Sequence, residues 1–231
     1  MRQAPASLRR TLTAIYGKLL ARFGRQHWWP GETPFEVMVG AILTQNTAWS
    51  NAASAISRLK RTGLLDSARL VRVPKDRLAR QIRPSGYFNQ KAERLKSFVR
   101  YFQNRYGADI RRMKKVPWVR LRQELLNLPG IGPETADSIL LYALHKPTFV
   151  VDAYTRRVLA RHSLISWEDS YGQIQALFQR NLPPRVSLFN EYHALLVALG
   201  KELCRTHPIC HLCPLRSIGK LRLETTPAPR R

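Results

Sequence analysis

An all-α fold is predicted for this chain of 231 residues by its composition and by the spacing of its apolar residues. Hydrophobic residues make up 44% of the sequence and charged residues 23%, which is typical of a globular protein and excludes a disordered or collagen-like chain. Apolar residues recur at three- and four-residue steps along most of the chain, whereas the alternation expected of β-hairpins is nearly absent. The length suits one large domain or two small ones.

The helices are expected where this periodicity is strongest. The first contains an apolar stripe formed by Leu8, Leu12, Ile15, Leu19 and Phe23. Further helices are predicted over residues 35–44, 48–60, 66–70, 75–82, 89–106, 118–126, 135–144, 153–162, 170–181 and 187–203. The helix at 48–60 is expected to bury Ala52, Ala55, Ile56 and Leu59. The helix at 89–106 is expected to present a basic outer face made of Lys91, Arg94, Lys96 and Arg100.

The charge balance indicates a polyanionic partner. Against 15 Asp and Glu the chain has 39 Lys and Arg, a formal net charge of +24, and its isoelectric point is about 11.1. Such a field attracts nucleic acid whatever the fold, although ribosome association or a generally basic proteome would also account for it. No apolar stretch approaches the roughly 20 residues that span a bilayer, so no membrane partner is expected.

A glycine-containing turn between two predicted helices is the first candidate site. Leu128, Gly130, Ile131 and Gly132 occupy this turn, and Pro133 stands at the first position of the following helix. Glycines let a phosphate approach the backbone, and a helix N-terminus attracts negative charge, so the turn is expected to hold a DNA phosphate. A plain helix connection closed by a glycine is the alternative.

Asp152 follows the apolar run Phe149–Val151 and precedes a predicted helix. An aspartate there caps a helix N-terminus in many proteins. It could equally project a charge that activates water or stabilises a positively charged sugar. The spacing alone is compatible with both roles.

These motifs together resemble those of the endonuclease III superfamily of helix-hairpin-helix DNA glycosylases. The similarity covers residues 128–137 and 150–152, and extends to an early block at 33–37 and 40–47 and a middle block at 84–92. The resemblance implies a two-lobed fold with a groove that holds Asp152 as catalytic residue. It also implies a monomeric enzyme that flips a damaged base out of double-stranded DNA and cuts its N-glycosidic bond.

Glu134 departs from the pattern of the bifunctional members, which have a lysine here that forms a Schiff base and cleaves the strand. The sequence therefore resembles the monofunctional 3-methyladenine DNA glycosylase branch more closely, which also has a Trp-Trp pair like Trp28 and Trp29. Hydrolysis of alkylated purines in base excision repair is the expected function. A bifunctional glycosylase and AP lyase acting on oxidised pyrimidines and a non-catalytic lesion-binding protein are the alternatives.

Aromatic and polar loop residues supply the remaining candidates around the DNA. Trp28, Trp29 and Trp49 are expected to form a base pocket, since a cationic purine stacks well on indoles; filling of a core is the alternative for each. Gln45 and Tyr87 resemble the wedge residues that fill the gap left by the flipped base. Together with the turn residues they make up the expected DNA-binding set.

The three cysteines, Cys204, Cys210 and Cys213, lie within ten residues, which suits a metal site in a reducing compartment and indicates the cytoplasm, with nucleoid association in a bacterium. Their spacing resembles the superfamily's [4Fe-4S] motif, with Gly219 in place of the fourth cysteine. Zinc, or no metal at all, is the alternative. A cysteine introduced at position 219 is expected to complete the site.

The domain organisation follows from the same resemblance. A central helical domain is expected over residues 30–146, and a second lobe over 1–29 and 147–225, with a tail at 226–231. The groove between the lobes is where catalysis is expected.

Overall fold

The computed structural model describes residues 5–219 and 221, so the expected tail at 226–231 lies outside the described part. All regular elements in the described residues are helices, which confirms the all-α prediction. The chain divides into two compact units. The central unit comprises Trp29–Lys146, and the terminal unit comprises the chain up to Trp28 and from Pro147 onward. Within the described residues, each helix is too short or too polar to cross a membrane.

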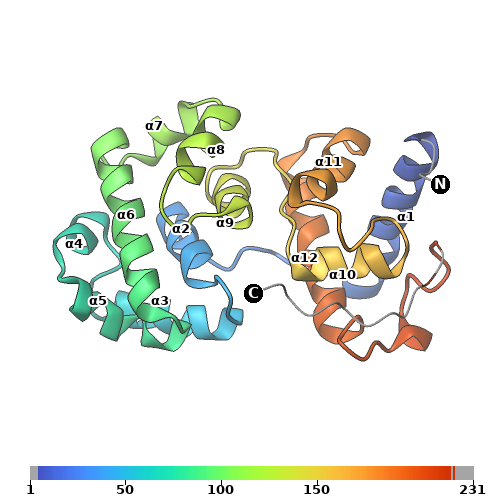
Figure 1. The fold of residues 1–231 in the computed structure, drawn as a ribbon, viewed down its shortest axis with the longest axis horizontal. Helices are drawn as coiled ribbons and strands as arrows, with labels where there is room; N and C mark the ends of the chain where they lie inside the picture. The colour runs from blue at the N-terminus through green and yellow to red at the C-terminus, as the bar shows by residue number, and fades with distance from the viewer. Residues whose placement is uncertain (1–4, 220, 222–231) are drawn as a thin grey trace. The chain divides into compact units, whose positions relative to one another are not determined.

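The central unit contains eight α-helices and two short helical turns (Figure 1). They are α2 (Pro34–Leu43), α3 (Trp49–Arg61), α4 (Ser67–Arg72), α5 (Lys75–Gln81), the 3₁₀ turn η1 (Arg83–Ser85), α6 (Phe88–Tyr106), α7 (Ile110–Lys115), α8 (Trp118–Leu126), α9 (Pro133–Ser138) and the π-helical turn η2 (Ile139–Ala143). The four residues expected to face inward from α3 are all buried, which confirms that prediction. The short helix α7 was not expected; it buries Met113 alone.

Helix α2 lies at the centre of this unit, and its sequence explains why it begins where it does. The Thr33 side chain caps it by accepting a hydrogen bond from the Glu36 N–H at 3.1 Å, and Pro34 occupies the first turn. Every residue from Glu36 to Leu43 is buried. The carboxylate of Glu36 is paired with Lys60 on α3 at 2.9 Å, so burial leaves this charge compensated.

Helix α6 packs against α2, α4 and α5, and two of its lysines are buried rather than exposed. The expectation of a basic outer face is therefore wrong for Lys91 and Lys96, which are 1% and 9% exposed. Lys91 Nζ donates to the carbonyl of Leu43, the last residue of α2, at 3.0 Å. Lys96 Nζ donates at 2.9 Å to Val71 O in the last turn of α4. Each ammonium thus satisfies carbonyls that a helix C-terminus leaves without an intrahelical partner.

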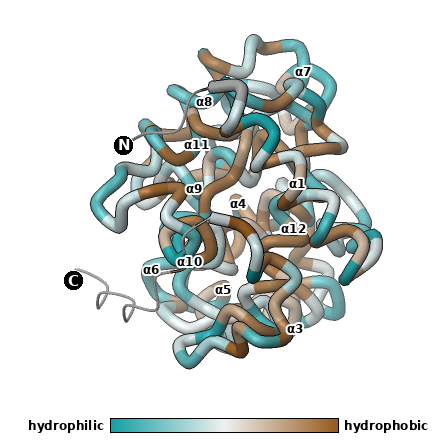
Figure 2. The backbone as a smooth tube through the Cα atoms, turned by 90° about the vertical axis from the view of Figure 1, so that its right-hand side faces the viewer, coloured by the Kyte–Doolittle hydropathy of each residue, from teal (hydrophilic) through white to brown (hydrophobic). Residues whose placement is uncertain are grey.

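The terminal unit contains α1 (Pro5–Phe23), α10 (Ala153–Arg161), α11 (Tyr171–Asn181), α12 (Val186–Glu202) and the 3₁₀ turn η3 (Cys210–Leu212). Helix α12 packs against α1 and α10, and Leu12, Ile15 and Leu19 of the predicted α1 stripe are fully buried. Figure 2 shows hydrophobic and hydrophilic stretches alternating along the helices, as expected of amphipathic elements with one buried face.

Candidate active site

The segment before α10 is fixed by side chains of α11 and by aromatic packing. The ring of Phe149 stacks on that of Phe178, with centroids 3.7 Å apart. Its backbone N–H donates to Gln179 Oε1 at 3.0 Å, and its carbonyl accepts from Gln175 Nε2 at 2.8 Å. A non-helical segment buried in this way has its polar groups satisfied, and it delivers Asp152 to a defined place at the start of α10.

Asp152 caps α10 with one oxygen of its carboxylate, and the second oxygen points to a different group. Oδ1 accepts a hydrogen bond from the Thr155 N–H at 2.7 Å, and Oδ2 lies 3.5 Å from Nε2 of His193 on α12. The side chain is 13% exposed. Burial acts to raise the pKa of Asp152, but the His193 imidazole and the hydrogen bonds at Thr155 outweigh it, so the pKa lies below the usual value for aspartate. The group is therefore a carboxylate at neutral pH.

The glycine-containing turn joins α8 to α9 in the central unit. Gly130 adopts a left-handed conformation, with φ at +75°, that only glycine takes up readily. Gly130 and Gly132 are exposed, Leu128 is half-buried, and Ile131 is buried. The N–H of Ile131 donates to the carbonyl of Leu128 at 3.1 Å, so this residue anchors the turn with its side chain and amide.

A buried ion pair braces the two arms of this helical hairpin. Arg122 on α8 donates through Nε and Nη2 to the two carboxylate oxygens of Asp137 on α9, at 2.8 and 3.0 Å. The Asp137 side chain is fully buried. A two-pronged contact of this kind fixes orientation as well as distance, so the angle between the arms is held by the protein itself.

Gln45, one expected wedge residue, bonds to the hairpin. Its Nε2 donates to Gly130 O and to Thr135 Oγ1, both at 2.9 Å, and its Oε1 accepts from Arg94 Nη1 at 2.7 Å. The Arg94 side chain also covers Gly130 so closely that a Cβ there would overlap it. The loop after α2 and the hairpin are therefore connected through a single amide group.

Tyr87, the second expected wedge residue, is 64% exposed and has a φ of +46°, a conformation that is uncommon for a residue with a side chain. It lies between the Arg83–Ser85 turn and α6. Lys91 Nζ donates to Ser85 O at 2.6 Å as well as to the end of α2, so one lysine secures the backbone near both Tyr87 and Gln45. A large exposed aromatic held in a strained conformation is typical of a functional surface.

Comparison with known proteins agrees with this geometry. A family model described as "HhH-GPD superfamily base excision DNA repair protein" matches residues 39–184, which is more than half of the chain and includes both the hairpin and Asp152. The chain belongs to the HhH-GPD superfamily.

Relatives and solved structures within the endonuclease III superfamily are similar over most of their length. A Methanocaldococcus jannaschii protein, MJ1434, whose name assigns it provisionally to the DNA repair glycosylases, is 46% identical over 87% of this chain and 92% of its own. Endonuclease III of Thermotoga maritima is 29% identical over 87% and 88%. The structure of H. pylori 3-methyladenine DNA glycosylase (MagIII) bound to 1,N6-ethenoadenine has a TM-score of 0.72 at 27% identity, covering 84% of this chain and 97% of that one.

Two of the three tryptophans expected to form a base pocket lie together in this HhH-GPD protein. Trp29 and Trp49 pack edge to face, with ring centroids 5.0 Å apart. The ring of Trp29 also packs on that of Tyr142, with centroids 5.2 Å apart. Gly40 lies close to both indoles, since a Cβ at this position would be 3.4 Å from each, in ordinary van der Waals contact. Trp28 belongs to the terminal unit, where Lys201 Nζ lies 5.7 Å from its ring centroid.

Glu134, which was expected at the position of the lyase lysine, lies in the first turn of α9 and is exposed. Lys91 would be an alternative amine in the central unit, and burial lowers its pKa to about 8, assisted by Arg94. Its Nζ is nonetheless buried and already bonded to two carbonyls. An amine held in this way cannot reach a sugar without breaking both bonds.

The cysteine loop is attached to α10 by arginines. Arg157 donates to the carbonyl of Cys204 at 2.7 Å, and Arg161 donates to Cys204 Sγ at 3.4 Å and to Thr206 O at 3.0 Å. Cys204, Cys210 and Cys213 line one cavity.

The residues present do not fit a [4Fe-4S] cubane bound by four thiolates. Gly219 has a φ of +63°, and a Cβ there would collide with the carbonyl oxygen of His162, so the expectation that a cysteine at 219 completes the site is wrong. The cavity beside the three thiols measures about 10 Å³, room for about one water molecule. Among the described residues, no three Cys, His, Asp or Glu side chains are placed to ligate one metal ion.

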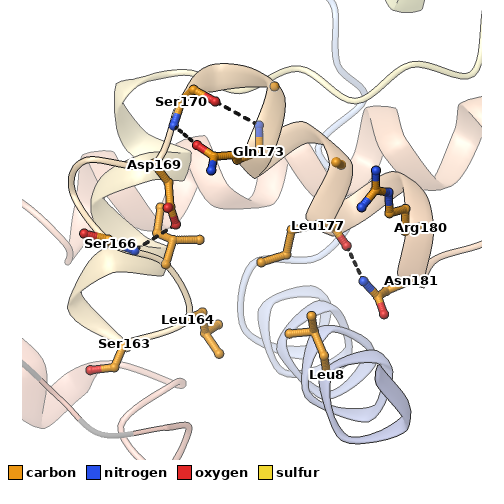
Figure 3. Close-up of a pocket in the computed structure, with 13 residues that line it drawn as sticks. Leu8, Ser163, Leu164, Ser166, Asp169, Ser170, Gln173, Leu177, Arg180 and Asn181 are labelled. Carbon is orange, nitrogen blue, oxygen red and sulfur yellow. Dashed lines mark hydrogen bonds between the residues drawn. The ribbon is translucent and has the colours of Figure 1, made fainter. Parts of the chain in front are cut away.

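A much larger cavity of about 870 Å³ lies in the terminal unit beside α1 and α11 (Figure 3). Its polar groups are bonded to one another: Ser170 and Gln173 form a reciprocal cap at the start of α11, and Asp169 accepts from the Ser166 N–H at 2.9 Å. None of the residues expected to act on DNA lines it. The cavity is therefore separate from the chemistry of this family.

Proposed function

We propose that this protein is a DNA glycosylase that hydrolyses the N-glycosidic bond of a damaged base without cutting the strand, with Asp152 as catalytic residue. The observation that carries the proposal is the carboxylate at the start of α10, which is nearly buried, has a lowered pKa, and uses only Oδ1 to cap the helix. Membership of a base excision repair superfamily supports the same conclusion.

The proposed reaction requires one negative charge near the sugar. As the bond between C1′ and the base breaks, the base leaves with the electron pair and the sugar becomes positively charged. The Asp152 carboxylate stabilises this cation electrostatically, most strongly where water is excluded. A water oxygen then bonds to C1′, and the proton it releases passes to the carboxylate and from there to solvent.

We infer that the protein does not cleave the DNA strand, because Glu134 stands where the bifunctional enzymes are expected to have a lysine. Glu134 has no amine with which to form a Schiff base, and Lys91 is occupied by two carbonyls. The rival proposal, a bifunctional glycosylase and AP lyase, needs such an amine. A lesion-binding protein without activity would need the Asp152 carboxylate only as the cap of α10, a task that Oδ1 performs by itself.

An alkylated purine such as 3-methyladenine is the proposed substrate, in double-stranded DNA bound by a monomer. The paired indoles of Trp29 and Trp49 support a cationic, planar base, which stacks favourably on electron-rich rings. The similar H. pylori glycosylase, whose structure contains 1,N6-ethenoadenine, adds support for a modified purine. The exposed glycines of the hairpin, with Gln45 and Tyr87, are the proposed DNA contacts.

Release of free base from methylated DNA tests the proposal, with strand nicking scored before and after alkali. Wild-type protein should release 3-methyladenine and leave nicks that appear only after alkali. Asp152→Asn should bind the same DNA and release base at least about 100-fold more slowly, since the amide keeps the capping oxygen but has no charge.

Asp66→Asn is the matched control, because Asp66 caps α4 through the Arg69 N–H at 2.9 Å in the central unit. It should leave excision unchanged. Near-normal excision by Asp152→Asn would refute the catalytic assignment. Nicks before alkali, together with covalent enzyme-DNA adducts trapped by borohydride, would favour the bifunctional reading.

The iron-sulfur cluster implied by the superfamily resemblance stays a prediction for this chain, and no step of the proposed reaction passes through it. Iron, sulfide and zinc analysis of protein purified without oxygen tests it directly. Stoichiometric iron would show that Cys204, Cys210 and Cys213 bind a cluster with a non-cysteine fourth ligand. Zinc would replace it by a thiolate-rich single-ion site.

A further inference from the structure

An imidazole from another helix faces the carboxylate of Asp152. His193 on α12 lies 41 residues further along the chain, and its Nε2 is 3.5 Å from Asp152 Oδ2. The exposed fraction is 6% for the His193 side chain and 13% for the Asp152 side chain. Helices α10 and α12 pack against each other, so this contact joins two helices of one unit.

The two oxygens of Asp152 have different surroundings. Oδ1 is held by the Thr155 N–H at 2.7 Å, which fixes the carboxylate to the helix start but leaves rotation of the group and the direction of Oδ2 to other contacts. His193 is placed to restrict this rotation. Its own ring is confined by the edge-to-face contact with Phe149, with centroids 6.5 Å apart. Phe149 is in turn stacked on Phe178.

We propose that His193 is a positioning residue for the proposed reaction, in which it orients Oδ2 of Asp152 toward the sugar. In the proposed complex, the 3.5 Å between Nε2 and Oδ2 shortens as bound DNA excludes water, and the Nε2–H then donates to Oδ2. Catalytic hydrogen bonds are often longer in the free enzyme than in the reacting complex. The inference rests on the proposed function, because it gives His193 a role only if Asp152 is catalytic.

Two opposing effects act on the charge of Asp152. Burial favours the neutral acid, which cannot stabilise a sugar cation, and His193 is the largest influence in the opposite direction. The backbone and side chain of Thr155 on α10 also favour the carboxylate, to a smaller extent than His193.

Single-turnover excision, with enzyme in excess over methylated DNA, tests the inference between about pH 4 and pH 8. His193→Leu should slow base release by about tenfold or more while changing the Kd for DNA less than about twofold. As pH is lowered, the rate of His193→Leu should also begin to fall at a higher pH than the rate of wild type, because the burial of Asp152 is then less compensated. His193→Gln retains an N–H donor and should recover part of the rate.

His162→Leu is the matched control, since His162 is also buried in the terminal unit but bonds to Ile218 O at 2.8 Å at the other end of α10. It should keep the wild-type rate per folded molecule. If Asp152→Asn is inactive and His193→Leu has the wild-type rate and pH profile, the positioning role is refuted and the glycosylase proposal stands.

Two further outcomes separate the remaining possibilities. Equal losses in His193→Leu and His193→Gln with an unmoved pH profile would show that His193 only supports packing, which also overturns the inference. If Asp152→Asn is as active as wild type, the proposed function itself fails. Circular dichroism shows whether each variant is folded, and titration with DNA gives the fraction of protein that is competent to bind, so a loss of rate caused by misfolding can be recognised.

Discussion

Lys91 is expected to make the stability of the protein rise with pH in the alkaline range. Replacing it by methionine keeps the length and apolar stem of the side chain but removes the ammonium. The carbonyls of Leu43 and Ser85 then lose their donor, and the central unit no longer contains this buried charge.

The size and sign of the effect follow from the pKa of Lys91, which burial lowers from 10.5 to about 8. Between these two values the unfolded chain binds more protons than the folded one, so stability is gained as pH rises. One pKa unit corresponds to about 1.4 kcal/mol, which makes the gain from about pH 7 to about pH 9.5 roughly 2 kcal/mol. Lys91→Met should lack this gain, whatever its stability at pH 7.

Urea unfolding followed by circular dichroism at the two pH values measures the difference between wild type and variant. Staying below pH 10 avoids the buried tyrosines Tyr101 and Tyr106, whose pKa values burial raises. Lys75→Met is the control, because Lys75 is exposed and paired with Glu93. A difference between wild type and Lys91→Met that is the same at both pH values would refute the reasoning. If Lys91→Met does not fold, Lys91→Gln provides a neutral donor for the same comparison.

Three further outcomes are expected. Gly219→Cys should lower the thermal unfolding midpoint without increasing bound iron. Gly172→Cys, at an exposed position with open space around it, is the control and should unfold like wild type. A higher iron content in Gly219→Cys than in wild type would contradict the prediction. Arg161→Met should make the buried thiol of Cys204 react faster with a thiol reagent in native protein, and an unchanged labelling rate would show that other contacts hold the loop. Arg122→Met should destabilise the protein by about 3–5 kcal/mol in urea unfolding, because the fully buried Asp137 carboxylate loses its two hydrogen bonds from Arg122. A loss below about 1 kcal/mol would contradict the inference that this ion pair holds the two helices of the hairpin together.

The sequence predicted the positions of helices and their buried faces better than the contacts that side chains make with distant parts of the chain. The apolar spacing in α3 identified Ala52, Ala55, Ile56 and Leu59 because burial of one helix face is a local property of the sequence. Lys91 was assigned to the surface because its partners are carbonyls of Leu43 and Ser85, which only the folded chain brings to it. Helix α7 was missed because four of its six residues are Lys or Arg, so that only Ile110 and Met113 are apolar.

The site was predictable where its signals are short-range. A helix cap at Asp152 and a left-handed Gly130 follow from a few neighbouring residues, and both are present. His193 was missed because its partner lies 41 residues earlier, although one local signal existed: it is the single ionisable side chain in the otherwise apolar run after Tyr192. Gly219 was misjudged because the collision is with His162, 57 residues earlier in the chain.

The bonding of Gln45 has a consequence for how such a protein would search DNA. The Gln45 amide is already hydrogen-bonded to Gly130, Thr135 and Arg94. To insert into an intact, well-stacked base pair, the side chain would have to break these three hydrogen bonds and also disrupt the stacking of the DNA, which is unfavourable. Only where a base pair is weakened by damage does the exchange become favourable. The three hydrogen bonds would thus set a threshold that lets the protein pass over sound duplex quickly and stop where the helix is already loose.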